Sequence, residues 1–289
     1  MSLEKIIEDA TVELIRRAVT KLPTDVMAAL ERAAGAETEE VAKRELQAMI
    51  ANAREAGRCT LPMCQDTGIP LFFVSMGPVR VKSLEGILSS AVRRATAEAP
   101  LRKNVVHPLT RSNSGDNTGI NMPHVSYSFH DRDYLEITFM PKGAGSENMS
   151  GLAMLNPSQG LPGIKKFVVE SIAKAEGKPC PPVIVGIGIG GSSDMCMVMA
   201  KQALLRPIGS INNDPSLANL EQELLWMINS TGVGPMGLGG RCTALAVHIE
   251  CASCHTASLP VGLNVQCYAA RRATMKVYQT DGRVEFGGD

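Results

Sequence analysis

The sequence predicts an α+β fold in two lobes. Segments with the 3.6-residue apolar period of helices are scattered among short runs with the alternation of strands, and the two kinds do not follow each other in strict turn. The 289 residues are enough for one large domain or for two lobes with a sizeable core. We expect one functional region over residues 1–289, with lobes at 1–150 and 151–289 and a break near 141–163.

The charge balance excludes several classes of partner. The formal net charge is zero, which argues against a general attraction to nucleic acid or to an anionic membrane. The N-terminus lacks a basic segment followed by an apolar one, and no apolar run approaches about 18 residues. We therefore expect a cytoplasmic protein without a membrane span, whose eight cysteines are reduced thiols. A small anionic ligand would need a few well-placed arginines or lysines.

Four amphipathic helices are predicted in the first third of the chain. The first runs from Leu3 to Pro23, the second is capped by Thr24 and closes at Gly35, and the third is capped by Thr38 and ends at Gly57. Ser83 caps the fourth. Their apolar stripes are core contacts and carry no functional role.

Strands are predicted from short apolar or alternating runs. Residues 69–76 form the first, and the alternating runs 125–129 and 135–139 form a hairpin. Further along, the pattern predicts helices over 164–175, 195–204 and 217–228 and strands over 183–189, 245–249 and 261–267.

The stretch Met63–Gly68 is the first candidate site. Between Pro62 and Gly68, a turn carries a thiol, an amide, a carboxyl and a hydroxyl on successive positions, which is too polar for core packing. Cys64 could bind a metal or cluster beside Asp66 as an acid or base. The plain alternative is a buried free cysteine next to a turn-capping aspartate.

A second candidate is the glycine-rich run Gly186–Gly191. It matches G-x-G-x-x-G after a strand, as in a dinucleotide-binding site. Such a site also has a second strand that ends in an acidic residue about 20 residues later, but here that region has the composition of a turn, which disfavours a nicotinamide cofactor. The glycines more simply allow backbone to approach closely. Cys196 lies in the first turn of the following helix, where the helix dipole favours a thiolate ligand. It could equally be a core cysteine.

The run Cys251–His255 matches C-x-x-C-H. Haem attachment at this pattern usually accompanies export, and no export signal is present. A zinc site would need two further ligands, and Cys242 is the only close candidate. A redox disulfide would be expected in a thioredoxin-like context, which this sequence lacks. We expect Cys251 and Cys254 to be structural or incidental. His255 heads a polar entry to a strand and matters only if other site residues converge on it.

Several motifs in order resemble one known family. They are Cys64-Gln-Asp-Thr-Gly, the loop Arg111–Pro123, Lys142-Gly-Ala-Gly-Ser-Glu-Asn, Gly190-Gly-Ser-Ser-Asp-Met-Cys196, Gly237-Leu-Gly-Gly, His255-Thr-Ala-Ser and Asn264-Val-Gln-Cys267-Tyr-Ala-Ala-Arg271. Together they resemble the iron–sulfur class I fumarate hydratases and their tartrate dehydratase relatives, specifically the α subunit of the two-subunit form. The resemblance covers residues 60–275, and the N-terminal helices fit loosely.

The resemblance implies a 4Fe–4S cluster and a set of site residues. It assigns Cys64, Cys196 and Cys267 as the three thiolate ligands, leaving one iron open as a Lewis acid. Around the substrate it places Gln65, Arg111, Lys142, Gly143 and Ala144, with Asp66 and His255 as acid and base candidates. An arginine fork suits a carboxylate. Ala144 replaces the second glycine of the family's pair, which weakens the case for a backbone contact there.

The implied activity is reversible hydration of fumarate to (S)-malate, a tricarboxylic acid cycle reaction. The family's remaining substrate-binding residues lie in a region beyond this sequence, so a β subunit would supply them, giving an α2β2 heterotetramer that is active only when complete. The near alternative is tartrate dehydration to oxaloacetate. A non-catalytic iron–sulfur redox or sensor module is a further alternative, which a carboxylate clamp disfavours, and an NAD-binding protein is the weakest.

Overall fold

The computed structural model describes residues 2–99 and 101–287, and the chain divides into two compact units. Unit 1 holds the residues up to Thr24, Asn52–Gly143 and the residues from Arg271 onward, and unit 2 holds Asp25–Ala51 and Ala144–Ala270. The sequence predicted two continuous lobes, whereas each unit is assembled from separated segments. One border, between Gly143 and Ala144, falls within the stretch where a break was expected.

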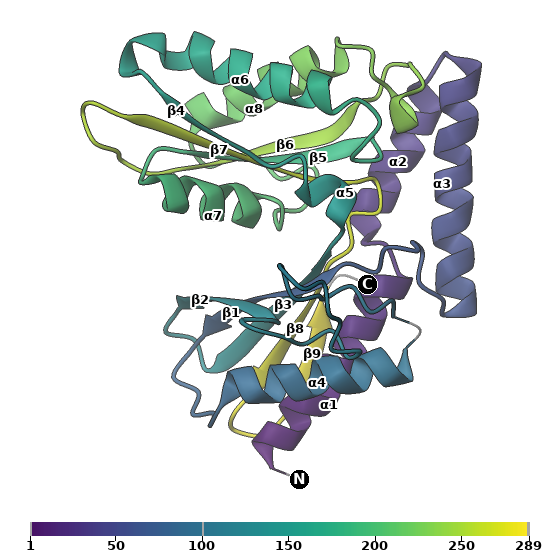
Figure 1. Ribbon diagram of the computed structural model, residues 1–289, viewed down its shortest axis with the longest axis vertical. Coiled ribbons are helices and arrows are strands. Elements are labelled where there is room, and N and C mark those ends of the chain that lie inside the picture. The colour runs from purple at the N-terminus through teal and green to yellow at the C-terminus, as the bar shows by residue number, and fades with distance from the viewer. Residues whose placement is uncertain (1, 100, 288–289) are drawn as a thin grey trace. The chain divides into compact units, whose positions relative to one another are not determined.

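Unit 1 is built on a five-stranded sheet in the order β2-β1-β3-β8-β9 (Figure 1). Its strands are β1 (Ile69–Met76), β2 (His124–Phe129), β3 (Tyr134–Lys142), β8 (Ala273–Tyr278) and β9 (Val284–Gly287). The predicted hairpin of β2 with β3 is wrong, because β1 lies between them, parallel to β2 and antiparallel to β3. The burial explains this: β1 is mostly buried, as a central strand is, whereas β2 is an exposed edge strand.

Two helices cover this sheet and complete the core of unit 1. They are α1 (Leu3–Thr20) and α4 (Leu84–Glu98), which pack against each other, and α1 also lies against β3 and β8. Their predicted apolar stripes are confirmed, because Leu14 and Leu88 are fully buried. The expected cap of α4 is not formed: Ser83 is left-handed and its side chain makes no capping bond.

Unit 2 is built on a four-stranded sheet in the order β4-β7-β5-β6. Its strands are β4 (Gly151–Leu155), β5 (Val183–Ile189), β6 (Ala244–Cys251) and β7 (Leu259–Gln266). The central pair β5 and β7 is antiparallel, and β6 is parallel to β5. Helices α6 (Gly160–Ala175) and α8 (Pro215–Asn229) cover one face and α7 (Ser193–Ala203) the other (Figure 1). Pro157–Gln159 and Pro235–Gly237 form short 3₁₀ turns.

The glycines of β5 serve helix packing. A Cβ on Gly188 would lie 2.0 Å from the carbonyl oxygen of Cys196, and one on Gly186 would lie 2.1 Å from that of Ala200. Both contacts are impossible for real atoms, so only glycine lets the backbone of α7 lie directly on the strand. This confirms the expectation of a close backbone approach and gives the G-x-G-x-x-G pattern a structural reason.

The N-terminal helices α2 (Thr24–Ala36) and α3 (Glu40–Cys59) follow α1, and the border between the units falls inside α3. Thr38 was expected to cap α3, but Glu37, which is 4% exposed and precedes the helix, provides the cap instead. Its carboxylate accepts the amides of Thr38 and Glu39 at 2.9 and 3.0 Å and that of Arg241 at 2.8 Å. A short helix, α5 (Ala144–Glu147), follows β3.

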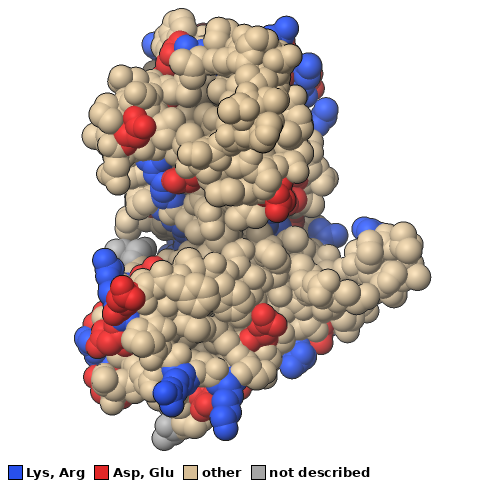
Figure 2. Space-filling view, turned by 90° about the vertical axis from the view of Figure 1, so that its left-hand side faces the viewer, with Lys and Arg blue, Asp and Glu red and all other residues tan. Residues whose placement is uncertain are grey.

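The surface carries both signs of charge. Figure 2 shows lysines and arginines interspersed with aspartates and glutamates over the face in view, in keeping with the zero net charge. Within residues 2–99 and 101–287, no helix is long and apolar enough to cross a membrane.

Candidate active site

The turn Cys64–Gly68 is fixed by backbone bonds at its start and by a left-handed glycine at its end. The Met63 amide donates to the Val19 carbonyl at 3.1 Å, and the Asn52 side chain donates to the Met63 carbonyl at 2.8 Å. Gly68 has φ +81°, and a Cβ there would lie 2.7 Å from the backbone nitrogen of Lys142. The turn therefore holds the half-buried Cys64 and the exposed Gln65 on a rigid base.

The carboxylate of Asp66 is oriented by two donors. Its Oδ1 accepts the Gly68 amide at 2.9 Å and the Asn104 side-chain amide at 3.1 Å. Asn104 also donates to the Gly68 carbonyl at 3.2 Å, so one side chain braces both ends of the turn. A half-buried carboxylate held in this way is preorganised to accept or return a proton.

Residues 101–104 were missed as part of the site by sequence reasoning. The Arg102 amide donates to the Thr67 hydroxyl at 3.0 Å, and that hydroxyl lies 3.3 Å from the Arg102 carbonyl. Arg102 therefore adds a cation beside the Cys64 turn, with an exposed side chain that makes no ion pair within the described residues. The sequence signal was faint, because a lone arginine and an asparagine after a helix are common.

The end of β3 adjoins the same turn. Lys142, 1% exposed, pairs with Ile69 in the sheet. A Cβ on the next residue, Gly143, would lie 3.1 Å from Asp66 Oδ2. Two of the predicted motifs, separated by some 75 residues of sequence, thus meet inside unit 1. Ala144 begins α5 with an exposed side chain in unit 2.

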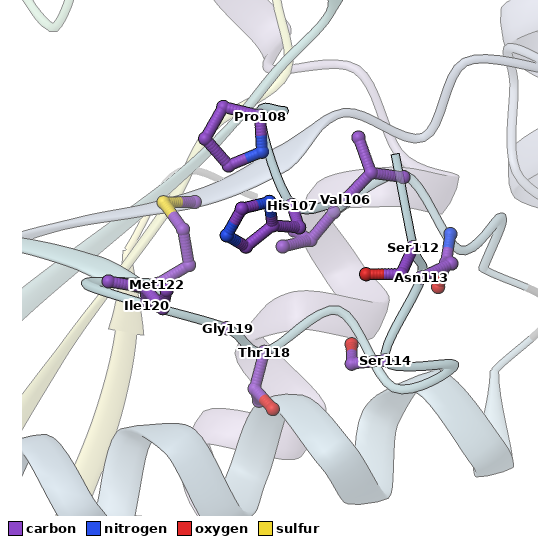
Figure 3. A pocket seen from close by; sticks show the side chains of 11 residues that line it. Val106, His107, Pro108, Ser112, Asn113, Ser114, Thr118, Gly119, Ile120 and Met122 are labelled. Atoms are coloured by element: carbon purple, nitrogen blue, oxygen red, sulfur yellow. The ribbon is translucent and has the colours of Figure 1, made fainter. Parts of the chain in front are cut away.

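Arg111 lies in a loop that borders a pocket, and no hydrogen bond or ion pair joins its side chain to Asp66 within residues 2–99 and 101–287. Its backbone is left-handed at φ +59°, its amide donates to the His107 carbonyl at 2.9 Å, and its side chain is exposed. The adjoining pocket encloses about 260 Å³. Polar side chains such as Ser112 and apolar ones such as Met122 line it, with His107 between them in Figure 3.

In unit 2, Cys267 follows β7 and lies beside a cysteine that sequence reasoning did not select. The amide of Tyr268, the next residue, donates to the carbonyl of Cys180 at 3.2 Å. Cys180 is half-buried and left-handed at φ +54°, and the bond between Pro181 and Pro182 that follows it is cis. The signal was present, because Cys180 stands among three prolines in Pro179-Cys-Pro-Pro, the kind of bordered turn that singled out Cys64.

Cys196 is not brought to Cys267. Its carbonyl lies 2.6 Å from where a Cβ of Gly262 would be, near the far end of β7. Cys267 lies five positions after Gly262, which is about 16 Å of strand at about 3.3 Å per residue. That distance is too long for one cubane to bridge.

The Cys196 thiol also behaves as a core thiol. It is 0% exposed, and its Sγ donates to the Ser193 carbonyl at 3.2 Å. Burial raises the pKa of Cys196, outweighing the helix N–H groups that act in the opposite direction. The dipole argument for a thiolate is therefore overcome by desolvation.

His255 is exposed and fixed by its own turn. Its Nδ1 accepts the Ala257 amide at 3.1 Å, which places the proton of the neutral ring on Nε2. The neighbouring Cys251 and Cys254 are exposed, and all eight cysteines are free thiols. Partial desolvation of the Cys251 thiol, together with nearby negative groups such as Asp214, raises the pKa of Cys251, which does not favour a reactive thiolate there.

Cysteines in turns are the side chains of this chain whose chemistry suits an iron–sulfur cluster. In the described part of the chain, no group of three or more His, Cys, Asp or Glu side chains is placed to hold one ion. Cys64 in unit 1 and Cys180 and Cys267 in unit 2 are half-buried, stand in turns and form no disulfide, and cysteine thiolates are the ligands that iron–sulfur clusters take.

Comparison with known proteins defines the family. The model of the fumarate hydratase (Fumerase) family matches residues 8–276, nearly the whole chain. The chain belongs to the fumarate hydratase family. This places it among the hydro-lyases and confirms the resemblance drawn from the motifs.

Two relatives of this fumarate hydratase family member carry a more specific name. The putative L(+)-tartrate dehydratase subunit alpha of Methanocaldococcus jannaschii is 52% identical over 279 residues, covering 94% of this chain and 97% of the relative. The L(+)-tartrate dehydratase subunit alpha of Escherichia coli K12 is 38% identical over 263 residues, covering 90% and 86%.

Proposed function

We propose that the chain is the α subunit of an iron–sulfur hydro-lyase that interconverts fumarate and (S)-malate. The observation that carries this proposal is the Asp66 carboxylate, fixed by Gly68 and Asn104 two residues after the candidate ligand Cys64. An acid or base placed beside an electrophilic centre is what the removal of water from a 2-hydroxy acid requires.

The proposed cluster ligands are Cys64, Cys267 and a third cysteine. The sequence indicated Cys196, but the geometry within unit 2 favours Cys180, whose carbonyl is bonded to the residue after Cys267. When bound, a cluster of four irons with three thiolate ligands supplies an open iron that acts as a Lewis acid toward the substrate hydroxyl.

The protein residues would bind the dicarboxylate and move the proton. Asp66 is the proposed base for the proton on the carbon next to the hydroxyl-bearing one, and His255 can donate from Nε2. Arg111 is a proposed carboxylate ligand, and Arg102 joins it because its backbone is bonded to Thr67 of the same turn as Asp66. Gln65, Lys142, Gly143 and Ala144 complete the proposed substrate contacts.

The second candidate substrate is L(+)-tartrate, which carries one more hydroxyl group than malate. The names of the two relatives favour it. Both substrates are four-carbon dicarboxylates that lose water from adjacent carbons, so the same proton transfer and the same arginines serve either one.

We also propose a β subunit as partner, in an α2β2 assembly. The relatives are named as alpha subunits, which implies a second kind of subunit. Arg102 and Arg111 together provide only one arginine for each carboxylate of the substrate, so further ligands for the dianion would come from the β subunit. The free thiols fit a reducing compartment such as the cytoplasm.

The experiment is an anaerobic assay of the chain, reconstituted with iron and sulfide and mixed with its β partner, on malate, fumarate and L(+)-tartrate. Loss of water from malate or tartrate that depends on both subunits is the expected result. A complex that carries the cluster and dehydrates neither acid would refute the proposal, and the ratio of kcat/KM values decides between the two substrates.

A further inference from the structure

Arg271 is a buried arginine that forms no ion pair in the described part of the chain, although the Asp66 carboxylate lies nearby, on the other side of Gly143. Its side chain is 2% exposed, and its Nη2 donates to the backbone carbonyl of Asp66 at 2.8 Å. Its Nε and Nη1 are buried without a hydrogen-bond partner, and across residues 2–99 and 101–287 the guanidinium makes no ion pair.

Such a group is unstable in a folded protein unless an anion reaches it. Arginine stays protonated at all ordinary pH values, so it cannot escape the cost of burial by losing its charge. An unpaired buried charge costs several kcal/mol, and unmade N–H bonds add to that cost. The two free donors therefore indicate a resident anion that fits beside them.

The position of Arg271 indicates which anion this is. Its Nη2 is bonded to the turn that carries Cys64, and along the chain Arg271 follows Cys267 by four residues. A four-iron cluster with three thiolates is a resident anion, and its sulfur atoms accept hydrogen bonds. A substrate carboxylate leaves after each turnover and would strand the charge again.

We propose that Nε and Nη1 of Arg271 donate hydrogen bonds to the sulfur atoms of the cluster, which makes Arg271 the charge partner of the cluster. This inference rests on the proposed function. Donors to cluster sulfur stabilise the more negative, reduced form, so Arg271 raises the reduction potential. It also links cluster binding to stability, because the buried charge destabilises the empty protein and is neutralised in the loaded one.

The test compares the full chain with Arg271→Met, which removes the charge at similar length, and Arg271→Lys, which keeps it. Arg283→Gln is the control, since Arg283 belongs to the same unit and its side chain is 54% exposed. Each protein is melted with and without reconstituted cluster, and the cluster potential is measured by anaerobic redox titration of its absorbance or electron paramagnetic resonance signal.

We expect the empty Arg271→Met protein to melt at or above the temperature of the empty parent, and to gain less on loading. Its cluster potential should be more negative, that of Arg271→Lys should lie between the two, and Arg283→Gln should match the parent. A purely structural role through the Asp66 carbonyl predicts the opposite for the empty protein, namely a lower melting temperature.

An unchanged potential and an unchanged gain on loading in Arg271→Met would overturn the inference while leaving the hydro-lyase proposal intact. A parent chain that binds neither iron nor sulfide, alone or with its partner, would overturn both. Because Arg271→Lys keeps the charge, it still supplies a potential to compare if Arg271→Met fails to fold.

Discussion

The backbone amide of Tyr268 lies 3.2 Å from the carbonyl oxygen of Cys180 and donates to it. This bond ties the turn after β7 to the turn before β5, two segments almost 90 residues apart in sequence. It brings the backbone at Cys267 to that at Cys180, whereas Cys196 is carried toward the other end of the sheet by α7. This proximity within unit 2 is the observation that supports Cys180 and Cys267 as a pair of proposed cluster ligands.

Gly68→Ala should destabilise unit 1. A Cβ at this position meets the backbone of Lys142 at 2.7 Å, and φ is +81°. Because strain and overpacking add, we expect a loss of about 2–4 kcal/mol in the free energy of unfolding, measured by urea denaturation. Gly35→Ala is the control: nothing lies within 4 Å of its Cβ position in α2, so it should be neutral or stabilise by up to about 1 kcal/mol. Equal effects of the two substitutions would contradict this packing.

Glu37→Gln should change how stability depends on pH. Burial alone would raise the pKa of Glu37, but the amides of Glu39, Arg241 and Thr38 outweigh it and hold the pKa below its ordinary value of 4.5. A lowered pKa stabilises the folded state above pH 4.5, and this contribution is lost as the pH falls through the folded pKa. The substitution should therefore cost about 1–3 kcal/mol at pH 7, with the difference from the parent shrinking in acid.

The measurement for Glu37 is a series of urea unfolding curves from pH 7 down to pH 3, with the exposed Glu39→Gln as control. The control should follow the parent at every pH. A constant difference between Glu37→Gln and the parent across the series would show that the carboxylate does not titrate as described.

Asn104→Ala should slow the reaction while leaving the cluster in place. It removes the side chain that donates to Asp66 Oδ1, so the proposed base loses its orientation. We expect kcat for malate dehydration to fall roughly 10-fold or more, with an unchanged visible spectrum. Asn113→Ala is the matched control, because Asn113 Nδ2 donates to Lys103 and not to Asp66. If Asn104→Ala keeps the kcat of the parent, the orientation of Asp66 by Asn104 does not contribute to the reaction.

Arg102→Ala and Arg111→Ala should both weaken dicarboxylate binding. Losing an arginine from a carboxylate costs about 1.5–3 kcal/mol, which corresponds to a 10- to 100-fold rise in KM. We expect the larger effect for Arg102, whose backbone is bonded to Thr67. The measurement is the steady-state kinetics of the two variants, with the visible spectrum as a check that the cluster is intact. An arginine whose removal leaves KM unchanged does not bind a substrate carboxylate.

Local patterns in the sequence predicted the bounds of strands better than they predicted which strands pair. The strands Ile69–Met76 and Val183–Ile189 have the bounds that the apolar runs predicted. The partner of β2 was not predictable, because alternation shows that a segment is a strand but not which edge it joins, and β1 is some 50 residues away. Strands β8 and β9 were missed, since they are only 6 and 4 residues long.

The candidate site residues also divide into those that the local sequence indicated and those that it did not. Cys64 and Asp66 stand in a turn whose polar run has no core explanation, so residue types were enough to select them as candidates. Cys196 was favoured by a local argument, the helix dipole, which burial overrides in the folded chain. Finding Asn104 required knowing what lies across from it, which a single sequence does not give, whereas Cys180 had a local signal in its neighbouring prolines.

The iron and sulfide content of the anaerobically reconstituted chain, compared with Cys180→Ser and Cys196→Ser, tests the proposed cluster and its third ligand together. We expect about four irons and four sulfides per chain for the parent and for Cys196→Ser, both with the same visible absorbance, and a loss of iron and of absorbance in Cys180→Ser. A parent chain without bound iron would rule out the cluster, and a Cys180→Ser chain that keeps its cluster while Cys196→Ser loses it would rule out Cys180 as the ligand.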